Sequence, residues 1–186
     1  MPATDFRFYL GSLALNFSGT LGFRSGARIE RIPSPAALGR WIAAAGLAAA
    51  ATPTAADYRA AIALREAIFS AGAAIVAGKR PPAAAVATIN AAARAGGLVV
   101  QLDPRTLDAR PLAKHPVRAA LASVAADAIA VIAHERARLG SCEDASCGAL
   151  TLSSARGAAR RWCSMKTCGN RAKVAAYRER RATVGA

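Results

Sequence analysis

Residues 142–168 read CEDASCGALTLSSARGAARRWCSMKTC, and this stretch contains all four cysteines of the 186-residue chain. They form two pairs at the same spacing, Cys142 with Cys147 and Cys163 with Cys168, and fifteen residues separate the pairs. This spacing lets two short loops approach each other and present four thiolates tetrahedrally to one zinc ion. Because four sulfur ligands leave no position for water, the pattern predicts a structural zinc site and not a catalytic one.

The context of the cysteines favours a metal over disulfide bonds. Asp5 and Arg7 interrupt the start of the chain, and Gly11 and Asn16 break the apolar stretch after them, so no signal-peptide pattern is present. We therefore expect a reducing, cytoplasmic setting, in which clustered cysteines are typically metal ligands. The segment also has few large apolar residues and needs a cross-link to fold. Two alternatives stay open, namely four unligated thiols and a disulfide pair.

Positive charges surround the second cysteine pair. A zinc ion with four thiolates has a formal charge of about −2, which nearby cations stabilise. The sequence after Cys168, GNRAKVAAYRERR, predicts a helix that Asn170 caps, so the last cysteine is expected at the start of this helix. The cations beside the pair are Arg160, Arg161, Lys166 and Arg171.

Residues 160–181, RRWCSMKTCGNRAKVAAYRERR, closely resemble the zinc finger of the CGNR family, which is named after the tetrapeptide at positions 168–171. The resemblance implies a small finger of zinc knuckles and a helix, of treble-clef or ribbon-like type. It also implies one structural Zn²⁺ as the cofactor, held by the four cysteines.

The charge of the chain points to a polyanionic partner. The formal net charge is +14, and residues 140–186 hold nine Lys and Arg against three acids, or +6. The first 139 residues hold sixteen against eight, or +8, so positive charge is densest in the C-terminal part. Hydrophobic residues make up 54% of the chain, many of them alanine. No uninterrupted apolar run approaches the roughly 18 residues of a membrane span, so we expect a soluble protein without a membrane partner.

Local signals predict that residues 1–140 form a mainly helical domain. Ser34-Pro35 is a helix start, Thr54 and Asp57 resemble a capping box, and His115-Pro116 opens the longest helix. Helices are expected over residues 35–45, 54–76, 82–94 and 117–139.

Strands are expected at two places in the same domain. Residues 6–23 favour a short strand or two with a turn, because aromatic and aliphatic residues alternate there with Gly and Ser. Residues 98–102, LVVQL, are the clearest strand, and residues 107–112 would complete a hairpin after the turn signal Asp103-Pro104. The predicted fold class is therefore α+β, mainly helical, with a domain over 1–140 and a zinc finger over 141–186.

The first domain also resembles the ABATE domain, which precedes the CGNR finger in that family and is associated with stress-induced transcription regulators. The matching segments are LALNFSGTL at 13–21, LGRWIAAAGL at 38–47 and the long segment 64–93. In the opening segment the family has an acid and then an Asn-Thr pair, whereas this chain has Asn16 and then Gly19-Thr20. The resemblance implies a domain that senses a small-molecule effector or mediates association, for example as a homo-oligomer.

Polar residues that interrupt the apolar opening are the candidate effector site. The alternative is that turns and caps inside the fold satisfy these groups. The candidates are Asn16, Ser18, Thr20, Arg24 and, from the long helix, Arg65.

The C-terminal helix is the candidate nucleic-acid interface. Measured around the helix axis from Arg171, Arg178 and Arg181 lie at about 340° and 280°, with Tyr177 at about 240°. A broad basic surface with an aromatic residue is typical of a helix that contacts nucleic acid, whereas a solvated or protein-docking face is the alternative. The candidates are Arg160, Arg161, Lys166, Arg171, Lys173, Tyr177, Arg178, Arg180 and Arg181.

No catalytic constellation is present in the sequence. His134-Glu135 begins like a zinc-protease helix, but position 138 is Arg and the second histidine is missing. The sequence therefore predicts a bacterial-type, DNA-binding transcription regulator without enzyme activity. The alternative is a zinc-stabilised interaction module whose basic helix binds an acidic protein.

Overall fold

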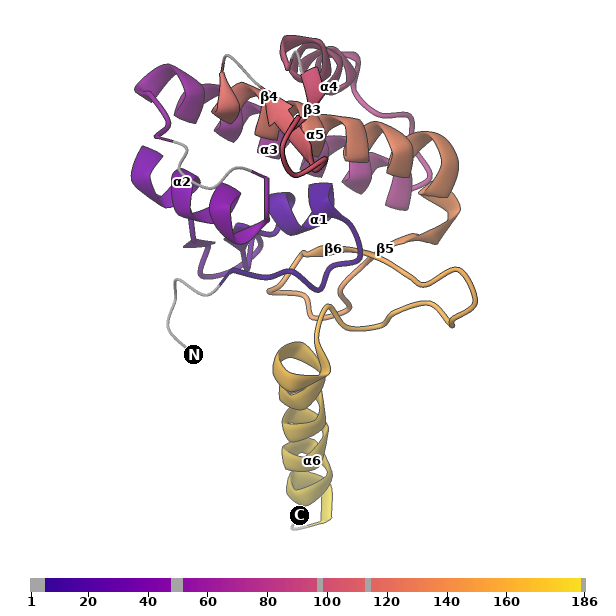
Figure 1. Cartoon of the computed structure of the whole chain (residues 1–186). Coiled ribbons are helices and arrows are strands. Elements are labelled where there is room, and N and C mark those ends of the chain that lie inside the picture. The colour runs from indigo at the N-terminus through magenta and orange to yellow at the C-terminus, as the bar shows by residue number, and fades with distance from the viewer. Residues whose placement is uncertain (1–5, 48–51, 97–98, 113–114, 185–186) are drawn as a thin grey trace.

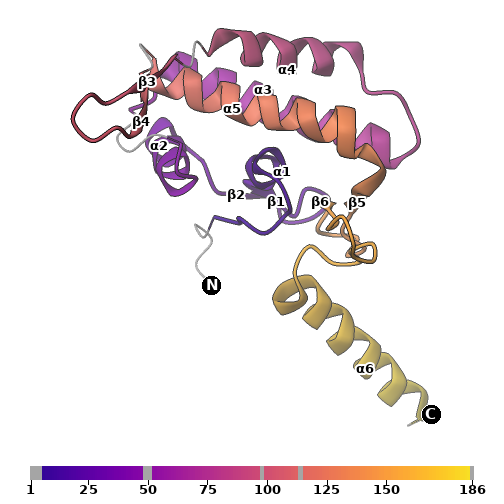
Figure 2. The same ribbon diagram turned by 45° about the vertical axis from the view of Figure 1, so that its right-hand side comes forward.

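The computed structural model describes residues 6–47, 52–96, 99–112 and 115–184. Three long helices lie against one another, namely α3 (Ala55–Val76), α4 (Ala83–Ala95) and α5 (Pro116–Ala130). The shorter helices α1 (Leu13–Ser18) and α2 (Pro35–Ala44) lie beneath this layer (Figure 1; Figure 2). On the far side of α1 lies the C-terminal part, from which helix α6 (Asn170–Val184) extends away from the rest of the protein. The predicted class, α+β and mainly helical, is confirmed.

Within the described residues, three two-stranded antiparallel sheets lie between these helices or next to them in the chain. The predicted hairpin after residue 98 is present, and its turn is stabilised by Asp103, whose carboxylate accepts from the backbone N–H groups of Arg105 and Thr106. The strand pairs are β1 (Leu21–Gly22) with β2 (Ile29–Glu30), β3 (Val99–Leu102) with β4 (Ala109–Leu112), and β5 (Leu139–Ser141) with β6 (Leu150–Leu152).

The predicted helix starts are confirmed. The Ser34 hydroxyl accepts a hydrogen bond from the Ala37 N–H, and Pro35 occupies the first helical position of α2. At α3 the capping box is complete, because Thr54 and Asp57 each accept a hydrogen bond from the other's backbone N–H. These local contacts fix where both helices begin.

The prediction of strands and a turn over residues 6–23 is partly wrong, because α1 forms in the middle of that segment. A helix of six residues is too short to be stable alone. Two hydrogen bonds hold its start. The Ser12 hydroxyl accepts a hydrogen bond from the Leu15 N–H, and the Asp127 carboxylate on α5 accepts one from the Ala14 N–H at 2.8 Å. The second contact joins residues far apart in the sequence.

The longest predicted helix ends earlier than expected. After Ala130 the backbone widens into a π-helical turn, Val131–Glu135, tightens into a 3₁₀ turn, and then enters strand β5. The Arg138 guanidinium donates to the Ser153 carbonyl at 2.8 Å, and the Ser153 N–H donates back to the Arg138 carbonyl. This reciprocal pair directs the chain into the β5–β6 hairpin.

The helical segment Pro116–Arg138 is long and apolar enough to cross a membrane, judged by length and composition alone. Half of its most apolar window is buried inside the protein, and core helices pass the same test. The sequence estimate, based on uninterrupted apolar runs, did not identify this segment.

Two buried clusters stabilise the fold. The first fills the space between α1 to α5 and contains Phe17, Trp41 and Val124, with the Phe17 and Trp41 ring centroids 4.8 Å apart. The second contains the four cysteines together with Leu10, Leu15, Leu150 and Leu152. Leu10 and Leu15 belong to the N-terminal segment, so the cysteine-rich part shares its core with the beginning of the chain. The predicted domain boundary, 140/141, falls inside strand β5.

Candidate metal centre and nucleic-acid interface

The four cysteine sulfurs form one compact, buried cluster. All four Sγ atoms lie within 4.8 Å of one another, with 3.6 Å between Cys147 and Cys163 and 3.5 Å between Cys163 and Cys168. A tetrahedral zinc site with Zn–S bonds of about 2.3 Å has sulfur–sulfur distances of about 3.8 Å, whereas a disulfide needs about 2.05 Å. The described cysteines are free thiols, and their arrangement fits one zinc ion.

Two loops present these thiols. Cys142 and Cys147 lie in the turn of the β5–β6 hairpin, where the Cys142 N–H donates to the Ala149 carbonyl at 2.8 Å. Gly148 follows with φ +59°, a conformation that glycine adopts without strain. Cys163 precedes the π-helical turn Met165–Gly169, Cys168 lies within this turn, and the turn runs directly into α6. Asn170 therefore lies inside a continuous helical segment, and the prediction that it caps the helix is wrong.

The thiols ionise unequally because they crowd one another. A hydrogen bond from Cys163 lowers the pKa of Cys147 to about 5, whereas burial raises the pKa of Cys168 to about 11. The pKa of Cys163 is raised strongly, first by its hydrogen bond to Cys147 and then by burial. A divalent cation supplies the positive charge that holds all four as thiolates. The bound ion would therefore fix both loops, and with them the start of α6.

Three of the predicted nucleic-acid residues make contacts within or beside the finger. Arg171 donates from Nη2 to the Asp144 carboxylate at 2.6 Å and to the Cys168 Sγ at 3.4 Å. Arg160 donates to the Tyr9 and Cys163 carbonyls, at 2.9 and 2.8 Å.

Arg161 is the third of these residues. Its guanidinium forms an ion pair with Glu143 at 2.8 Å and lies over the Trp162 ring. Since Glu143 follows the first cysteine of the hairpin, this pair links the two cysteine loops. The link lies at the surface, where ion pairs contribute little to stability.

The other six predicted nucleic-acid residues lie at the surface. Arg181 lies over the Tyr177 ring, with 5.8 Å from its guanidinium carbon to the ring centroid, and Tyr177 is 54% exposed. In Figure 1 helix α6 projects from the body along its whole length. The six exposed residues are Lys166, Lys173, Tyr177, Arg178, Arg180 and Arg181.

Two of the five candidate effector residues, Arg24 and Arg65, belong to one network of ion pairs. The buried Arg65 guanidinium donates to both Glu30 oxygens, at 2.7 and 2.8 Å, and to Glu66 at 2.8 Å. Arg24 forms an ion pair with Glu66 at 2.6 Å and donates to the Ser18 carbonyl. These contacts join the β1–β2 hairpin to α3.

Thr20 and Asn16 also have protein partners. The Thr20 hydroxyl donates to the Phe17 carbonyl at 2.7 Å, and the Asn16 side-chain oxygen accepts from the Leu10 N–H at 2.9 Å. Turns and helix ends therefore satisfy these groups, as the structural alternative predicted.

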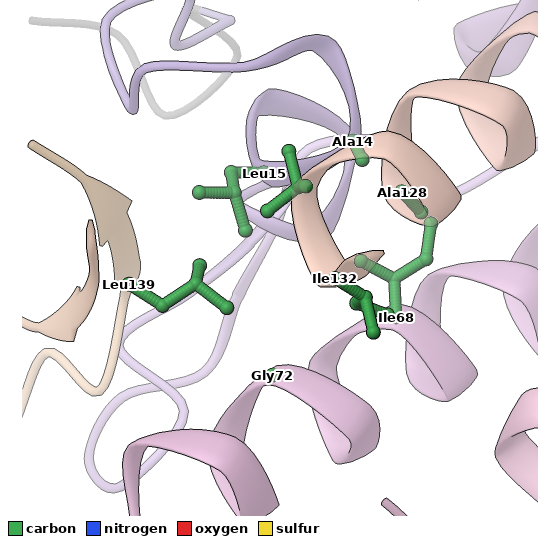
Figure 3. Close-up of a pocket in the computed structure, with 8 residues that line it drawn as sticks. Ala14, Leu15, Ile68, Gly72, Ala128, Ile132 and Leu139 are labelled. Carbon is green, nitrogen blue, oxygen red and sulfur yellow. The ribbon is translucent and has the colours of Figure 1, made fainter. Parts of the chain in front are cut away.

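A cavity lies elsewhere in this part of the protein. It is apolar, has a volume of about 10 Å³, and none of the five candidate effector residues lines it (Figure 3). This volume has room for about one water molecule and is too small for a small-molecule effector. Its walls come from α1, α3, the end of α5 and β5, and they are Ala14, Leu15, Ile68, Gly72, Ala128, Val131, Ile132 and Leu139.

Sequence analysis missed two residues of the metal centre, Asp144 and Phe23. Asp144 lies between Cys142 and Cys147 in the sequence. An acidic residue inside a cysteine loop is close to the metal centre, so this position could have been predicted from the sequence. Phe23 adopts φ +52°, and the Arg171 guanidinium lies 4.6 Å from its ring centroid. An aromatic residue rarely adopts this conformation, so no sequence rule identifies the position.

Two family models match the chain. ABATE, described as "Putative stress-induced transcription regulator", matches residues 11–135, and the CGNR zinc finger matches residues 138–181. No curated protein matches the sequence. The resemblances to both families that the sequence motifs indicated are therefore confirmed.

Proposed function

The chain belongs to the ABATE family, whose model is described as "Putative stress-induced transcription regulator", and it carries a CGNR zinc finger, and we propose that it binds duplex DNA through helix α6. The observation that carries this proposal is the exposure of α6, which projects from the body with its basic residues in solvent (Figure 2).

The dimensions of α6 suit the major groove. Its fifteen residues give a length of about 22 Å, and the groove is about 12 Å wide and accepts an α-helix. Tyr177, Arg178 and Arg181 lie within about 100° of one another around the axis, so they can face the groove together. Lys173 and Arg180 lie beside this face, where they can reach the phosphate backbone.

The zinc centre directs the helix in this proposal. The thiolates of Cys163 and Cys168 would fix the turn that starts α6, and Arg171 holds that turn to Asp144. The contacts of α6 described above lie at its start, so the position of its basic residues on DNA depends on this anchor. We therefore assign Arg160, Arg161 and Arg171 to the support of the helix, and the exposed residues of α6 to contacts with DNA.

Paired arginine variants test the proposal. Arg178→Ala/Arg181→Ala is expected to weaken duplex binding while zinc content stays the same. The slope of log affinity against log salt should flatten by about 0.9 for each phosphate that the variant no longer neutralises. The matched control is Arg59→Ala/Arg94→Ala, which removes the same charge from exposed sites on α3 and α4. Equal affinities of both double variants and the wild type would contradict the proposal.

A second candidate function is supported by the apolar residues of α6. Val174 is 40% exposed and Tyr177 54%, and they are three residues apart on the helix, as in helices that bind an apolar groove of a protein. In this case the partner would be an acidic protein. Two results together would favour this candidate. The affinity for duplex DNA would not depend on the DNA sequence, and an acidic protein would bind tightly.

A further inference from the structure

Phe23 lies where the N-terminal domain contacts the metal centre. It is the last residue before the turn of the β1–β2 hairpin, and its backbone adopts φ +52°, a conformation uncommon for a bulky residue. Its carbonyl accepts hydrogen bonds from the Gly26 and Arg28 N–H groups, at 2.9 and 3.0 Å, which hold the turn in this shape. Such an outlier persists only where the surroundings over-determine it.

Two arginines from opposite parts of the chain lie against the Phe23 ring. The Arg171 guanidinium at the start of α6 is 4.6 Å from the ring centroid, and that of Arg7 is 5.2 Å away. Arg7 is buried, and Phe23 itself is half-buried against the cysteine cluster. Partly desolvated cation–π contacts of this kind are stronger than exposed ones.

The residue after Phe23 anchors the same turn on both sides. The Arg24 N–H donates to the carbonyl of Cys147 at 3.2 Å, whereas the Arg24 guanidinium is bound to Glu66 and lies 4.0 Å from the Phe69 ring centroid. Glu66 and Phe69 belong to α3. The turn is therefore fixed to the helical domain and, through Phe23 and the Arg24 backbone, to the finger.

We infer that Phe23 is a positioning residue that fixes the direction of α6 relative to the helical domain, through the contact of its ring with Arg171. Arg171 connects the Phe23 ring to the finger, because it also binds Asp144 in the β5–β6 hairpin and Cys168 at the start of α6. The N-terminal domain thus sets the angle at which the exposed helix is presented. The expected effect on DNA affinity rests on the proposed function, whereas the orientation of α6 does not.

Residual dipolar couplings of the zinc-loaded, ¹⁵N-labelled full-length protein test this inference. In the wild type, the amides of α3 and α6 are expected to fit one alignment tensor. In Phe23→Leu, which keeps an apolar side chain but removes the ring, the couplings of α6 should shrink or fit a different tensor. The couplings of α3 and the zinc content should stay the same. Phe23→Tyr keeps the ring and should behave as the wild type.

The control is Tyr58→Leu, which removes an aromatic ring that packs on the helical core, away from the turn and the finger. Its α6 couplings should not change. If Phe23→Leu does not fold, Phe23→Met replaces it, because methionine fills the space of the ring with a flexible, unbranched side chain. Couplings of α6 that fit the α3 tensor in Phe23→Leu, as in the wild type, would overturn the inference.

A DNA-binding measurement forms a separate arm. Phe23→Leu should weaken duplex binding by about fivefold and leave the salt slope unchanged, because the substitution removes no positive charge that neutralises a phosphate. A flattened slope would instead identify a direct role in phosphate binding and contradict a positioning role. If the wild type does not bind duplex DNA, the proposed function fails, and the dipolar couplings still decide whether Phe23 orients α6.

Discussion

The carboxylate of Glu66 forms ion pairs with two arginines from different segments, Arg24 and Arg65. Burial acts to raise its pKa, but hydrogen bonds from Arg24 and Arg65 outweigh it and hold the pKa below the usual value of 4.5. A carboxyl group whose pKa is lowered on folding stabilises the fold above its unfolded pKa, and this contribution disappears as the pH falls. Since the side chain is 44% exposed, solvent screens part of the effect.

Glu66→Gln is therefore expected to lower the free energy of unfolding at pH 7. The difference from the wild type should begin to shrink as the pH falls to about 5 and should largely disappear once the pH is below the lowered pKa of Glu66 in the folded protein. Chemical denaturation at several pH values measures both quantities. A difference that stays constant as the pH is lowered through this range would show that folding does not lower the pKa of Glu66.

The cysteines permit a second test at the scale of the residue. The wild type is expected to bind about one zinc per chain, and Cys→Ser at any of the four positions should reduce this, because three sulfurs leave the tetrahedral site incomplete. Elemental analysis and thiol titration of the native protein measure the outcome. Four freely reacting thiols and no metal in the wild type would contradict the site.

At the scale of the element, the start of α3 depends on its capping box. Hydrogen bonding from Thr54 lowers the pKa of Asp57, which shows how closely the two side chains interact. Thr54→Ala is expected to lower the free energy of unfolding by about 1 kcal/mol, measured by urea titration. Thr88→Ala is the control: the Thr88 hydroxyl bonds to the Ala84 carbonyl inside α4, so its removal should be nearly neutral. Equal effects of the two changes would argue against the cap.

At the scale of the whole molecule, the shared core should couple the N-terminal segment to zinc binding. Leu10 is 1% exposed and packs in the cluster that contains the cysteines, although it is far from them in the sequence. Leu10→Ala should cost about 2–5 kcal/mol of stability and also weaken zinc binding, measured by competition with a chelator. Leu121→Ala, in the helical core, should cost a similar amount of stability without changing zinc affinity. Unchanged zinc affinity in both variants would show that the two parts are independent.

The sequence by itself determined the features that local chemistry encodes. The helix starts at Ser34 and Thr54 follow from hydrogen bonds within a few residues. The cysteine spacing predicted the zinc ligands, and the resemblance of residues 160–181 to the CGNR finger identified the family. Leu150 and Leu152, the apolar residues between the cysteine pairs, are buried as such residues must be in a small finger.

Only the tertiary structure decided how the two parts meet. It folded residues 13–18 into a helix that Asp127 holds, directed Arg171 toward Asp144 and Cys168, and placed Leu10 and Phe23 against the cysteine cluster. Apart from the contact of Arg171 with Cys168, three residues away, each of these depends on a partner distant in the sequence. Caps and periodicity concern residues within one or two turns of each other, whereas the burial of a side chain and the partner of a charge are set by which remote segments the folded chain brings together.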